Sequence, residues 1–426
     1  MNFSRSMAAL AVSTVLFGTT QAQAAAPSAE AILKNYADIA HATYEDSLLT
    51  AKQLNSVIDQ FLAQPDEANL NKARQAWIAA RVPYQQSEAY RFGNALVDDW
   101  EGKVNAWPLD EGLIDYVDPG YGSESDENPF YSANIIANKT LKIGGVEVDA
   151  TQINKQLLGE VLHEIDEVEA NVATGYHAIE FLLWGQDLNG TQPGAGQRPA
   201  TDFDLQNCSN GNCDRRRDYL KAATELLIDD LAEMTANWAE NGAARQDLQA
   251  KGPQGGLSTM LTGMGSLAYG ELAGERTKLG LMLHDPEEEH DCFSDNTHFS
   301  HYYDAKGIKN VYLGQYTRVD GSQVKGASLS ELVNSQNADA DSALRGKLDA
   351  TEAAAQAMVD AAATGNTFDV LIAADNAAGN QTVQTFVDAL VAEAEAIENV
   401  IATLELDGIE LEGSDSLDNP ALVGAE

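Results

Sequence analysis

Basic residues are scarce in this chain of 426 residues: 26 lysines and arginines stand against 66 aspartates and glutamates, a formal net charge of −40. Nucleic-acid binding needs a basic surface, so this composition argues against it, and an anionic membrane surface would repel the chain. Solubility is the simplest reason for such acidity. The same charge attracts cations, including metal ions.

Long apolar runs are also lacking, because no segment after the N-terminus has about 18 uninterrupted apolar residues, and we therefore expect no transmembrane helix. The first residues, MNFSRSMAALAVSTVLFGTTQAQAAAP, combine Arg5, a short apolar run over residues 7–17 and a small-x-small cleavage site. This pattern predicts a cleaved signal peptide over residues 1–24 and a mature chain in the periplasm.

Cysteines number three. Cys208 and Cys213 lie in the polar string NCSNGNCDRR, and in an oxidising compartment this spacing favours a local disulfide. A metal site at this pair is less favoured, because no histidine is near in sequence. Cys292 has no obvious partner.

Helical periodicity dominates what is present, and alternating strand-like runs are few. The sequence therefore predicts an all-α fold, with a Gly/Pro/Asn-rich linker over residues 190–212 and Pro83 as a kink inside the second helix. The predicted helices cover residues 32–62, 70–92, 154–183, 219–238, 257–281, 343–363 and 382–404.

Residues 70–95 resemble residues 257–281 when the two are aligned without gaps. The matched pairs are Leu70 with Leu257, Trp77 with Met264, Glu88 with Glu275, Arg91 with Lys278 and Gly93 with Gly280. We therefore predict two related helical bundles that arose by duplication. They would span residues 25–205 and 215–406, before an acidic tail over residues 407–426.

The string ATGYHAIEFLLWGQD carries the first candidate site. His177 and Glu180 are three residues apart and so neighbour each other on one helical face, beside an apolar stripe. A carboxylate there is costly unless it is paired or binds a metal. Gly175, in the helix, indicates close approach by another backbone or a ligand. A buried histidine paired with a glutamate is the simpler alternative.

The second predicted helix strengthens the metal interpretation, because its core stripe begins apolar and ends with Arg81, Glu88 and Arg91. Glu88 beside His177 and Glu180 would make a nitrogen and oxygen ligand set, which suits iron, zinc or manganese better than calcium. An ion-pair network of Arg81, Glu88 and Arg91 that joins helices is the alternative, and both can hold together.

Two further strings contain ligand-type side chains. HEIDE, residues 163–167, lacks the second histidine of HExxH, and we predict a solvated face there. Residues 285–304 could form a second metal site or a loop organised by turns and caps over residues 294–297. The candidate ligands of that second site are His290, Cys292, His298 and His301.

Four segments together resemble the imelysin family, which includes iron-regulated protein A-like proteins. GYHAIEFLLWG matches the family's GxHxxE signature, and the other three are ARQAWIAARVPYQQSEAYRFGN, NAWPLDEGLIDY and EEEHDCFSDNTH. The resemblance covers nearly all of the predicted mature chain. It implies an all-helical body of two related bundles, with the signature at their junction, and a link to iron uptake or regulation.

Carried over residue by residue, the resemblance makes His177 and Glu180 the metal ligands and Gly175 the motif glycine. We add Glu88 as a third ligand and Glu45 as a weaker fourth. Arg81 and Arg91 would balance charge or hold an anionic chelator.

We therefore expect a periplasmic iron-binding protein that takes up iron or an iron chelate and serves an inner- or outer-membrane uptake complex, with outer-membrane association as an option. A zinc-dependent peptidase is the alternative, because the family is also classified among metallopeptidases, although a third ligand and a general base are not obvious. A non-catalytic protein- or peptide-binding module is another. A c-type haem is not expected, because CxxCH is absent.

Overall fold

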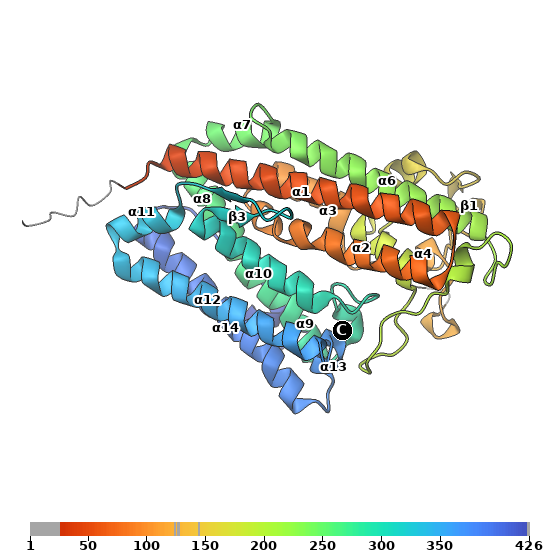
Figure 1. Cartoon of the computed structure of the whole chain (residues 1–426). Helices are drawn as coiled ribbons and strands as arrows, with labels where there is room; N and C mark the ends of the chain where they lie inside the picture. Colours follow the sequence, from red (N-terminus) through yellow and green to blue (C-terminus); the bar gives the residue numbers. More distant parts are fainter. Residues whose placement is uncertain (1–25, 123–124, 126–127, 144, 424–426) are drawn as a thin grey trace, which may run out of the picture.

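The computed structural model of the chain describes residues 26–423 apart from 123–124, 126–127 and 144. The predicted signal peptide therefore lies outside the described residues. Helices make up most of the fold (Figure 1), as the periodicity predicts. No helix in the described ranges is both long and apolar enough to cross a membrane.

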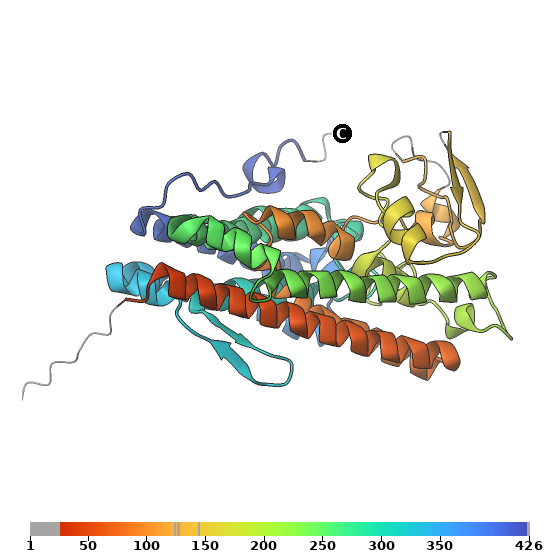
Figure 2. The same ribbon diagram turned by 90° about the horizontal axis from the view of Figure 1, so that it is seen from above.

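The first group of helices is built around α1 (Ala29–Ala63), which packs against α2 and α6. The Ser28 hydroxyl accepts from the Ala31 amide at the start of α1, and Asp66 caps α2 in the same way. Seen from above, α1 and α6 run side by side along the molecule (Figure 2). The other elements of this half are α2 (Glu67–Gln85), η1 (Glu88–Tyr90), α3 (Ala95–Asn105), α4 (Glu111–Ile114), η2 (Pro119–Tyr121), η3 (Leu157–Leu162), η4 (Ile165–Glu167), α5 (Gly175–Trp184), η5 (Ala200–Phe203), α6 (Cys213–Trp238) and α7 (Ala243–Ala250).

The second group packs α10, α12 and α14 together, and α10 also contacts α2 of the first group (Figure 1). Its elements are α8 (Gly252–Ser266), the π-helix η6 (Leu267–Lys278), α9 (Leu279–Leu283), η7 (Pro286–Glu288), α10 (Thr297–Leu313), α11 (Leu329–Gln336), α12 (Ala338–Ala362), α13 (Phe368–Ile372), α14 (Ala377–Thr403) and α15 (Asp415–Asp418). The junction between the two groups is where the candidate site is found.

Two short antiparallel hairpins were not predicted. One pairs β1 (Thr140–Ile143) with β2 (Val146–Asp149), and the other pairs β3 (Gln315–Thr317) with β4 (Gln323–Lys325). The second hairpin packs on α1 and is anchored there by Arg318, which donates to Asp46 at 2.8 Å. Strands of three or four residues are too short to show a clear alternating pattern.

The predicted helix over residues 154–183 is wrong. Glu164, Asp166 and Glu167 have φ values of 55°, 65° and 61°, and this left-handed backbone interrupts any α-helix. The segment is instead divided into η3, η4, a loop and α5. The helix predicted over residues 70–92 likewise ends at Gln85, after which the Ser87 amide and hydroxyl both donate to the Tyr84 carbonyl oxygen in a tighter turn; Pro83 lies inside the helix.

The proposed duplication remains a prediction. The aligned pairs Leu70 with Leu257 and Trp77 with Met264 are buried in both halves. The pair Glu88 with Glu275 differs, because the first side chain is buried and the second exposed.

Candidate metal centre

Helix α5 is completely buried and is positioned by its first residue. Gly175 has φ +78°, and a Cβ atom there would lie 2.5 Å from the Val104 carbonyl oxygen at the end of α3. The predicted close backbone approach is therefore present, although Gly175 begins the helix instead of lying within it. This contact fixes His177 and Glu180, whose side chains are 1% and 0% exposed, at the centre of the molecule.

The loop before α10 supplies two more ligand-type side chains, His290 and Asp291. The Asp291 amide donates to the Thr297 hydroxyl at 2.9 Å, which folds the loop back on itself. Asn296 and Ser300 both donate to Asp291 Oδ2. These bonds hold the other carboxylate oxygen toward α5.

His177, Glu180, His290 and Asp291, together with Arg81, form what we call the His–Asp cluster. His177 Nδ1 lies 3.1 Å from Glu180 Oε2 and 4.0 Å from Asp291 Oδ1, and His290 Nδ1 lies 3.4 Å from Asp291 Oδ1. The Nδ1 contact with Glu180 is of hydrogen-bond length and leaves Nε2 as the free ligand atom of His177. One ligand atom from each of His177, His290 and Asp291 lies within 4.8 Å of the others, a spacing that one metal ion can bridge.

Arg81 supplies the positive charge of this cluster. It donates from Nη2 to Asp291 Oδ1 at 2.7 Å and from Nη1 to Asn105 Oδ1 at 2.5 Å, and Nη2 lies 3.4 Å from His290 Nδ1. Arg81 therefore lies where the sequence predicts a charge-balancing residue. Its single positive charge faces two carboxylates, Glu180 and Asp291.

One atom of the cluster has no partner among the described residues. His177 Nε2 is buried and makes no hydrogen bond there, while the ring packs 5.1 Å from Trp107 and 4.7 Å from His290, centroid to centroid. Buried polar atoms are nearly always hydrogen-bonded, so an unpartnered imidazole nitrogen indicates a bound group. Together with the nitrogen and oxygen atoms of the other cluster residues, His177 Nε2 makes a ligand set that fits a transition-metal ion.

The electrostatics favour neutral imidazoles. Burial, reinforced by Arg81, lowers the pKa of His177 to about 3, and burial together with Arg276 lowers the pKa of His290 well below its usual value. Burial also raises the pKa of Glu180, and Asp291 raises it further. Burial opposes ionisation of Asp291 too, but Arg81 and His290 hold its pKa well below the usual range. Neutral imidazole is the form that coordinates a metal.

A hollow of about 700 Å³ reaches the cluster from outside and is lined by Trp107 and His290. Eight of its lining residues are aspartates or glutamates and two are arginines. Such an excess of negative charge raises the local concentration of cations and repels anions.

Glu88 and Arg91 belong to a different group of charges, the arginine cluster, which comprises Glu88, Arg91, Glu271, Arg276 and Asp304. Arg276 donates to Glu88 Oε2 at 2.9 Å and to Glu271 Oε1 at 2.7 Å, and Arg91 pairs with Glu271 at 3.3 Å. The structure thus does not place Glu88 with His177. The alternative network of Arg81, Glu88 and Arg91 is not formed either, because each pairs with other residues.

Glu45 lies elsewhere, on α1. Its side chain is 39% exposed and pairs with Arg318 at 3.1 Å, with His41 3.9 Å away. Of the predicted metal ligands, the structure therefore brings together His177 and Glu180. His290 and Asp291 are the neighbours that the ligand prediction missed, and the only signal for them was the string EEEHDCFSDNTH.

The four candidate ligands of residues 285–304 do not form one site. His290 joins His177, whereas Cys292 is buried among apolar side chains and burial raises its thiol pKa. His301 Nε2 lies 3.0 Å from the Arg276 carbonyl oxygen. The loop is organised by a turn, in which the Asn296 amide donates to the Asp291 carbonyl oxygen at 3.3 Å, but the Asn296 side chain does not cap α10. Ser294 donates instead to Glu180 Oε1, from its amide at 3.0 Å and its hydroxyl at 2.6 Å.

The remaining predictions concern the surface. Glu164 and Glu167 of HEIDE are exposed as predicted, but His163 is largely buried and burial lowers its pKa.

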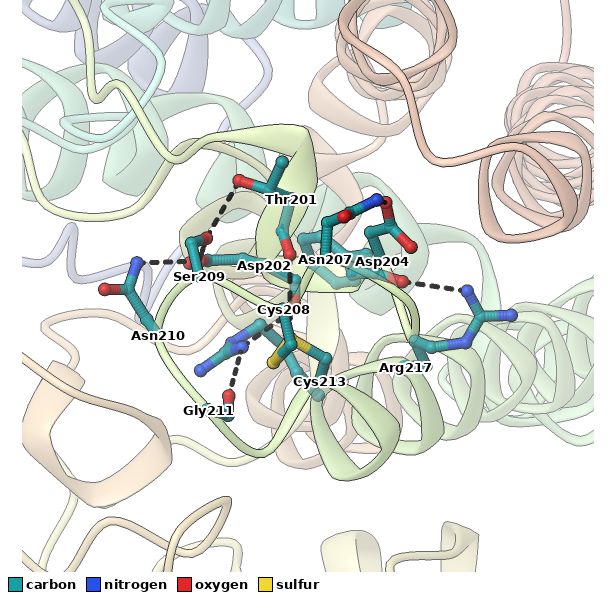
Figure 3. The surroundings of a disulfide bond; sticks show 12 residues. Thr201, Asp202, Asp204, Asn207, Cys208, Ser209, Asn210, Gly211, Cys213 and Arg217 are labelled. Carbon is teal, nitrogen blue, oxygen red and sulfur yellow. Dashed lines mark hydrogen bonds between the residues drawn. A yellow bond between two sulfur atoms is a disulfide. The ribbon is translucent and has the colours of Figure 1, made fainter.

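Cys208 and Cys213 form a disulfide (Figure 3). Ser209 and Asn210 inside the bridged loop both donate to Asp202 Oδ1 at 2.7 Å.

Comparison with known proteins agrees with this architecture. A stretch of 64 residues is 39% identical to iron-regulated protein A of Synechococcus elongatus, but it spans only 15% of this chain and 18% of that protein. An iron-regulated protein A precursor from Parabacteroides distasonis has a similar fold, with a TM-score of 0.63 and 19% identity over 89% of this chain and 96% of that one. An imelysin-like protein from Psychrobacter arcticum has a TM-score of 0.58 and 17% identity over 89% and 97%.

A match to a family model identifies the family of this chain, which the structural likenesses alone do not. The model for the imelysins, also named peptidase M75, matches residues 40–397, which is most of the sequence. This chain belongs to the imelysin family.

Proposed function

We propose that the chain binds a divalent transition-metal ion, iron first, at the His–Asp cluster and serves iron uptake or its regulation in the periplasm. The observation that carries this proposal is the convergence of His177, His290 and Asp291 from two distant segments in a buried site, with Glu180 hydrogen-bonded to His177 and His177 Nε2 unpartnered within the described ranges. A mixed nitrogen and oxygen set suits iron, manganese or zinc.

The charges around the site favour a bare cation over an anionic chelate. Arg81 already donates to Asp291 and Asn105, and Arg91 pairs with Asp98 at 2.8 Å. An anionic chelator would therefore meet an acidic approach and two arginines that are already engaged.

Two observations support an oxidising compartment and an iron-related role. The disulfide between Cys208 and Cys213 is of the kind that persists outside the cytoplasm. The named relative in Synechococcus elongatus is an iron-regulated protein. The predicted signal peptide points the same way. We therefore propose a periplasmic carrier that passes iron to a membrane uptake complex.

A zinc-dependent peptidase is the second candidate, and one observation favours it. His177, His290 and Asp291 each offer one atom within 4.8 Å of the others, which supplies the three ligands that hydrolytic zinc sites use. Glu180 lies beside them and is a candidate general base. Against this, Ser294 and His177 already contact both Glu180 oxygens.

Metal analysis of protein purified without chelators, followed by anaerobic Fe²⁺ and Zn²⁺ titration, tests the proposal. We expect about one ion per chain, and we expect His177→Ala and His290→Ala each to lower the affinity at least about 100-fold, more than the loss of an outer-shell contact. His301→Ala is the matched control, since it removes a buried histidine outside the cluster. Unchanged affinity in both cluster variants would refute the site.

The same proteins separate the two candidates. A peptide library incubated with the zinc-loaded chain should stay intact if the protein is a carrier. Cleavage that disappears in folded Glu180→Gln protein would instead establish the peptidase.

A further inference from the structure

A second group of acids includes Asp295, which lies on the loop that presents His290 and Asp291. Asp187 follows α5, Asp295 lies just before α10, and Asp369 lies in α13, which is at one end of the second group of helices (Figure 1). One carboxylate oxygen from each lies within 4.8 Å of the others. We call these three residues the aspartate triad.

The triad is more than a surface patch of acids. Asp369 is 0% exposed, and its carboxylate oxygens make no hydrogen bond of good geometry with the described residues, although the Thr367 hydroxyl and the Val370 amide are near enough to stabilise its charge. Asp295 is 7% exposed, and its Oδ1 atom also has no hydrogen-bond partner among the described residues. Buried carboxylates are normally paired or bound to a metal, so unpartnered oxygens directed at two other acids indicate a ligand between them.

The surroundings of the triad add negative charge and no compensating cation. Glu289, 1% exposed and on the same loop, is close enough to be affected electrostatically by all three acids, and its Oε1 has no partner within the described ranges. No lysine or arginine in the described part of the chain forms an ion pair with Asp187, Asp295 or Asp369. This contrasts with the His–Asp cluster, where Arg81 forms an ion pair with Asp291 at 2.7 Å.

Protonation is the alternative way to bury these acids. Burial raises the pKa of Asp295 to about 8, with Asp369 as the next contributor, and burial also raises the pKa of Asp369 despite opposition from Thr367 and the Val370 amide. Protonation would remove charge and let one carboxyl O–H donate to a neighbouring carboxylate, but a single shared proton joins only two of the three acids. A bound cation would neutralise the triad and coordinate oxygens of all three acids at once.

The chemistry of the donors defines the class of cation. All are carboxylate oxygens, which hard cations prefer, whereas the His–Asp cluster also offers imidazole nitrogen. Calcium accepts irregular sites built from several carboxylates, whereas magnesium demands near-ideal octahedral geometry and keeps several waters. Three carboxylate oxygens within 4.8 Å of one another can therefore reach one calcium ion. Asp187 is only partly buried, which leaves a route to solvent.

We propose that Asp187, Asp295 and Asp369 bind a hard divalent cation, calcium by preference, and that this ion fixes the loop carrying His290 and Asp291. Asp295 is four residues beyond Asp291, and Ser294 between them holds Glu180. The ion would join the segment after α5, the loop before α10 and α13 into one unit. This proposal does not depend on iron binding at the His–Asp cluster.

Calcium titration by calorimetry and thermal unfolding, on the full-length mature protein freed of metal, tests it directly. We expect one calcium ion per chain and a rise in melting temperature of about 3 °C when calcium is about a hundred times its dissociation constant. Hydrogen exchange over residues 285–296 should slow on calcium addition. Magnesium should produce a smaller shift.

Variants distinguish the triad from other acids and from protonation. Asp369→Asn and Asp295→Asn should each abolish the calcium response, and without calcium each should melt at or above the wild-type temperature, because a repelling charge is gone. Asp388→Asn, at an exposed acid, and His177→Ala should both keep the response. A wild-type chain with no calcium-dependent shift at about 10 mM, well above the affinity range of extracellular calcium sites, would overturn the proposal. So would an undiminished response in both triad variants.

Discussion

Two buried clusters of charge border the same acidic hollow, and they balance their charges differently. In the arginine cluster, Arg276 contacts Glu88, Glu271 and Asp304 within 3.3 Å. In the His–Asp cluster, Arg81 is the one positive charge for two acids, Glu180 and Asp291, and the two imidazoles are neutral. The first cluster contains a fixed cation at its centre. The second has donors arranged for a cation that comes from outside.

The comparison shows why burial and charge alone do not identify a metal site. Both clusters contain carboxylates that are nearly inaccessible, and both join segments far apart in sequence. The difference lies in the neutral nitrogen ligands, among them the unsatisfied Nε2 atom of His177, which stand beside two acids in the His–Asp cluster. A buried acid next to arginine is a structural feature, whereas a buried acid next to neutral histidine is a candidate ligand.

The largest effect should come from removing the central cation of the arginine cluster. Arg276→Met leaves Glu88, Glu271 and Asp304 without their common partner, and breaking a buried ion pair in this way costs about 3–5 kcal/mol of unfolding free energy. Urea denaturation measures it. Arg91→Met, at a side chain that is 22% exposed, is the control and should cost less. A loss below about 1 kcal/mol for Arg276→Met would contradict the assigned role.

Glu88 distinguishes the ligand role predicted from sequence from the ion pair seen in the structure. Glu88→Gln should lower stability by about 1–3 kcal/mol, because a charge-assisted hydrogen bond to Arg276 is lost. Its affinity for Fe²⁺ should remain within about threefold of the wild type, in contrast to His177→Ala. A loss comparable with that of His177→Ala would make Glu88 a ligand and the two clusters one site.

Some features of the fold and the candidate site could be predicted from local sequence, and others could not. The all-α class and the neighbouring pair His177 and Glu180 follow from periodicity within a short segment. His290 and Asp291 lie more than a hundred residues away, and their approach depends on the loop that Thr297 folds back. Local spacing holds no information on that contact. Glu88 was predicted as a ligand because its helix appeared continuous, whereas α2 ends at Gln85 and directs Glu88 to Arg276.

The loop before α10 also supports the His–Asp cluster, because Ser294 holds Glu180. A change at Ser294 should therefore affect metal binding. Ser294→Ala removes both the hydroxyl contact with Glu180 and its orientation, and the loss of such an outer contact lowers metal affinity about 10–100-fold. Ser87→Ala is the control, since Ser87 likewise donates from its hydroxyl, but to the Tyr84 carbonyl oxygen outside the His–Asp cluster. Equal metal affinities for the two variants would show that Ser294 does not orient a ligand.

The smallest effect is a difference in how the two clusters respond to pH. Glu101 lies 3.9 Å from Arg91 at the edge of the arginine cluster, and burial raises the pKa of its carboxyl from an ordinary 4.5 to about 7. The folded chain then binds more protons than the unfolded chain between these values, so this residue lowers stability as pH rises from 4.5 to 7. His177 has the opposite sign, because its pKa of about 3 makes the folded chain bind fewer protons between pH 3 and 6.5, and its contribution is lost on acidification.

Glu101→Gln isolates the first of these contributions. The stability of the variant relative to wild type should rise between pH 4.5 and 7, by at most about 1.4 kcal/mol per pH unit, and then stay constant. Urea denaturation at several pH values measures the difference, and His177→Asn should show the reverse, gaining on wild type as pH falls below 6.5. If both differences changed with pH in the same direction, the two clusters would be one coupled network of charges, and the contrast between a fixed and an exchangeable cation would fail.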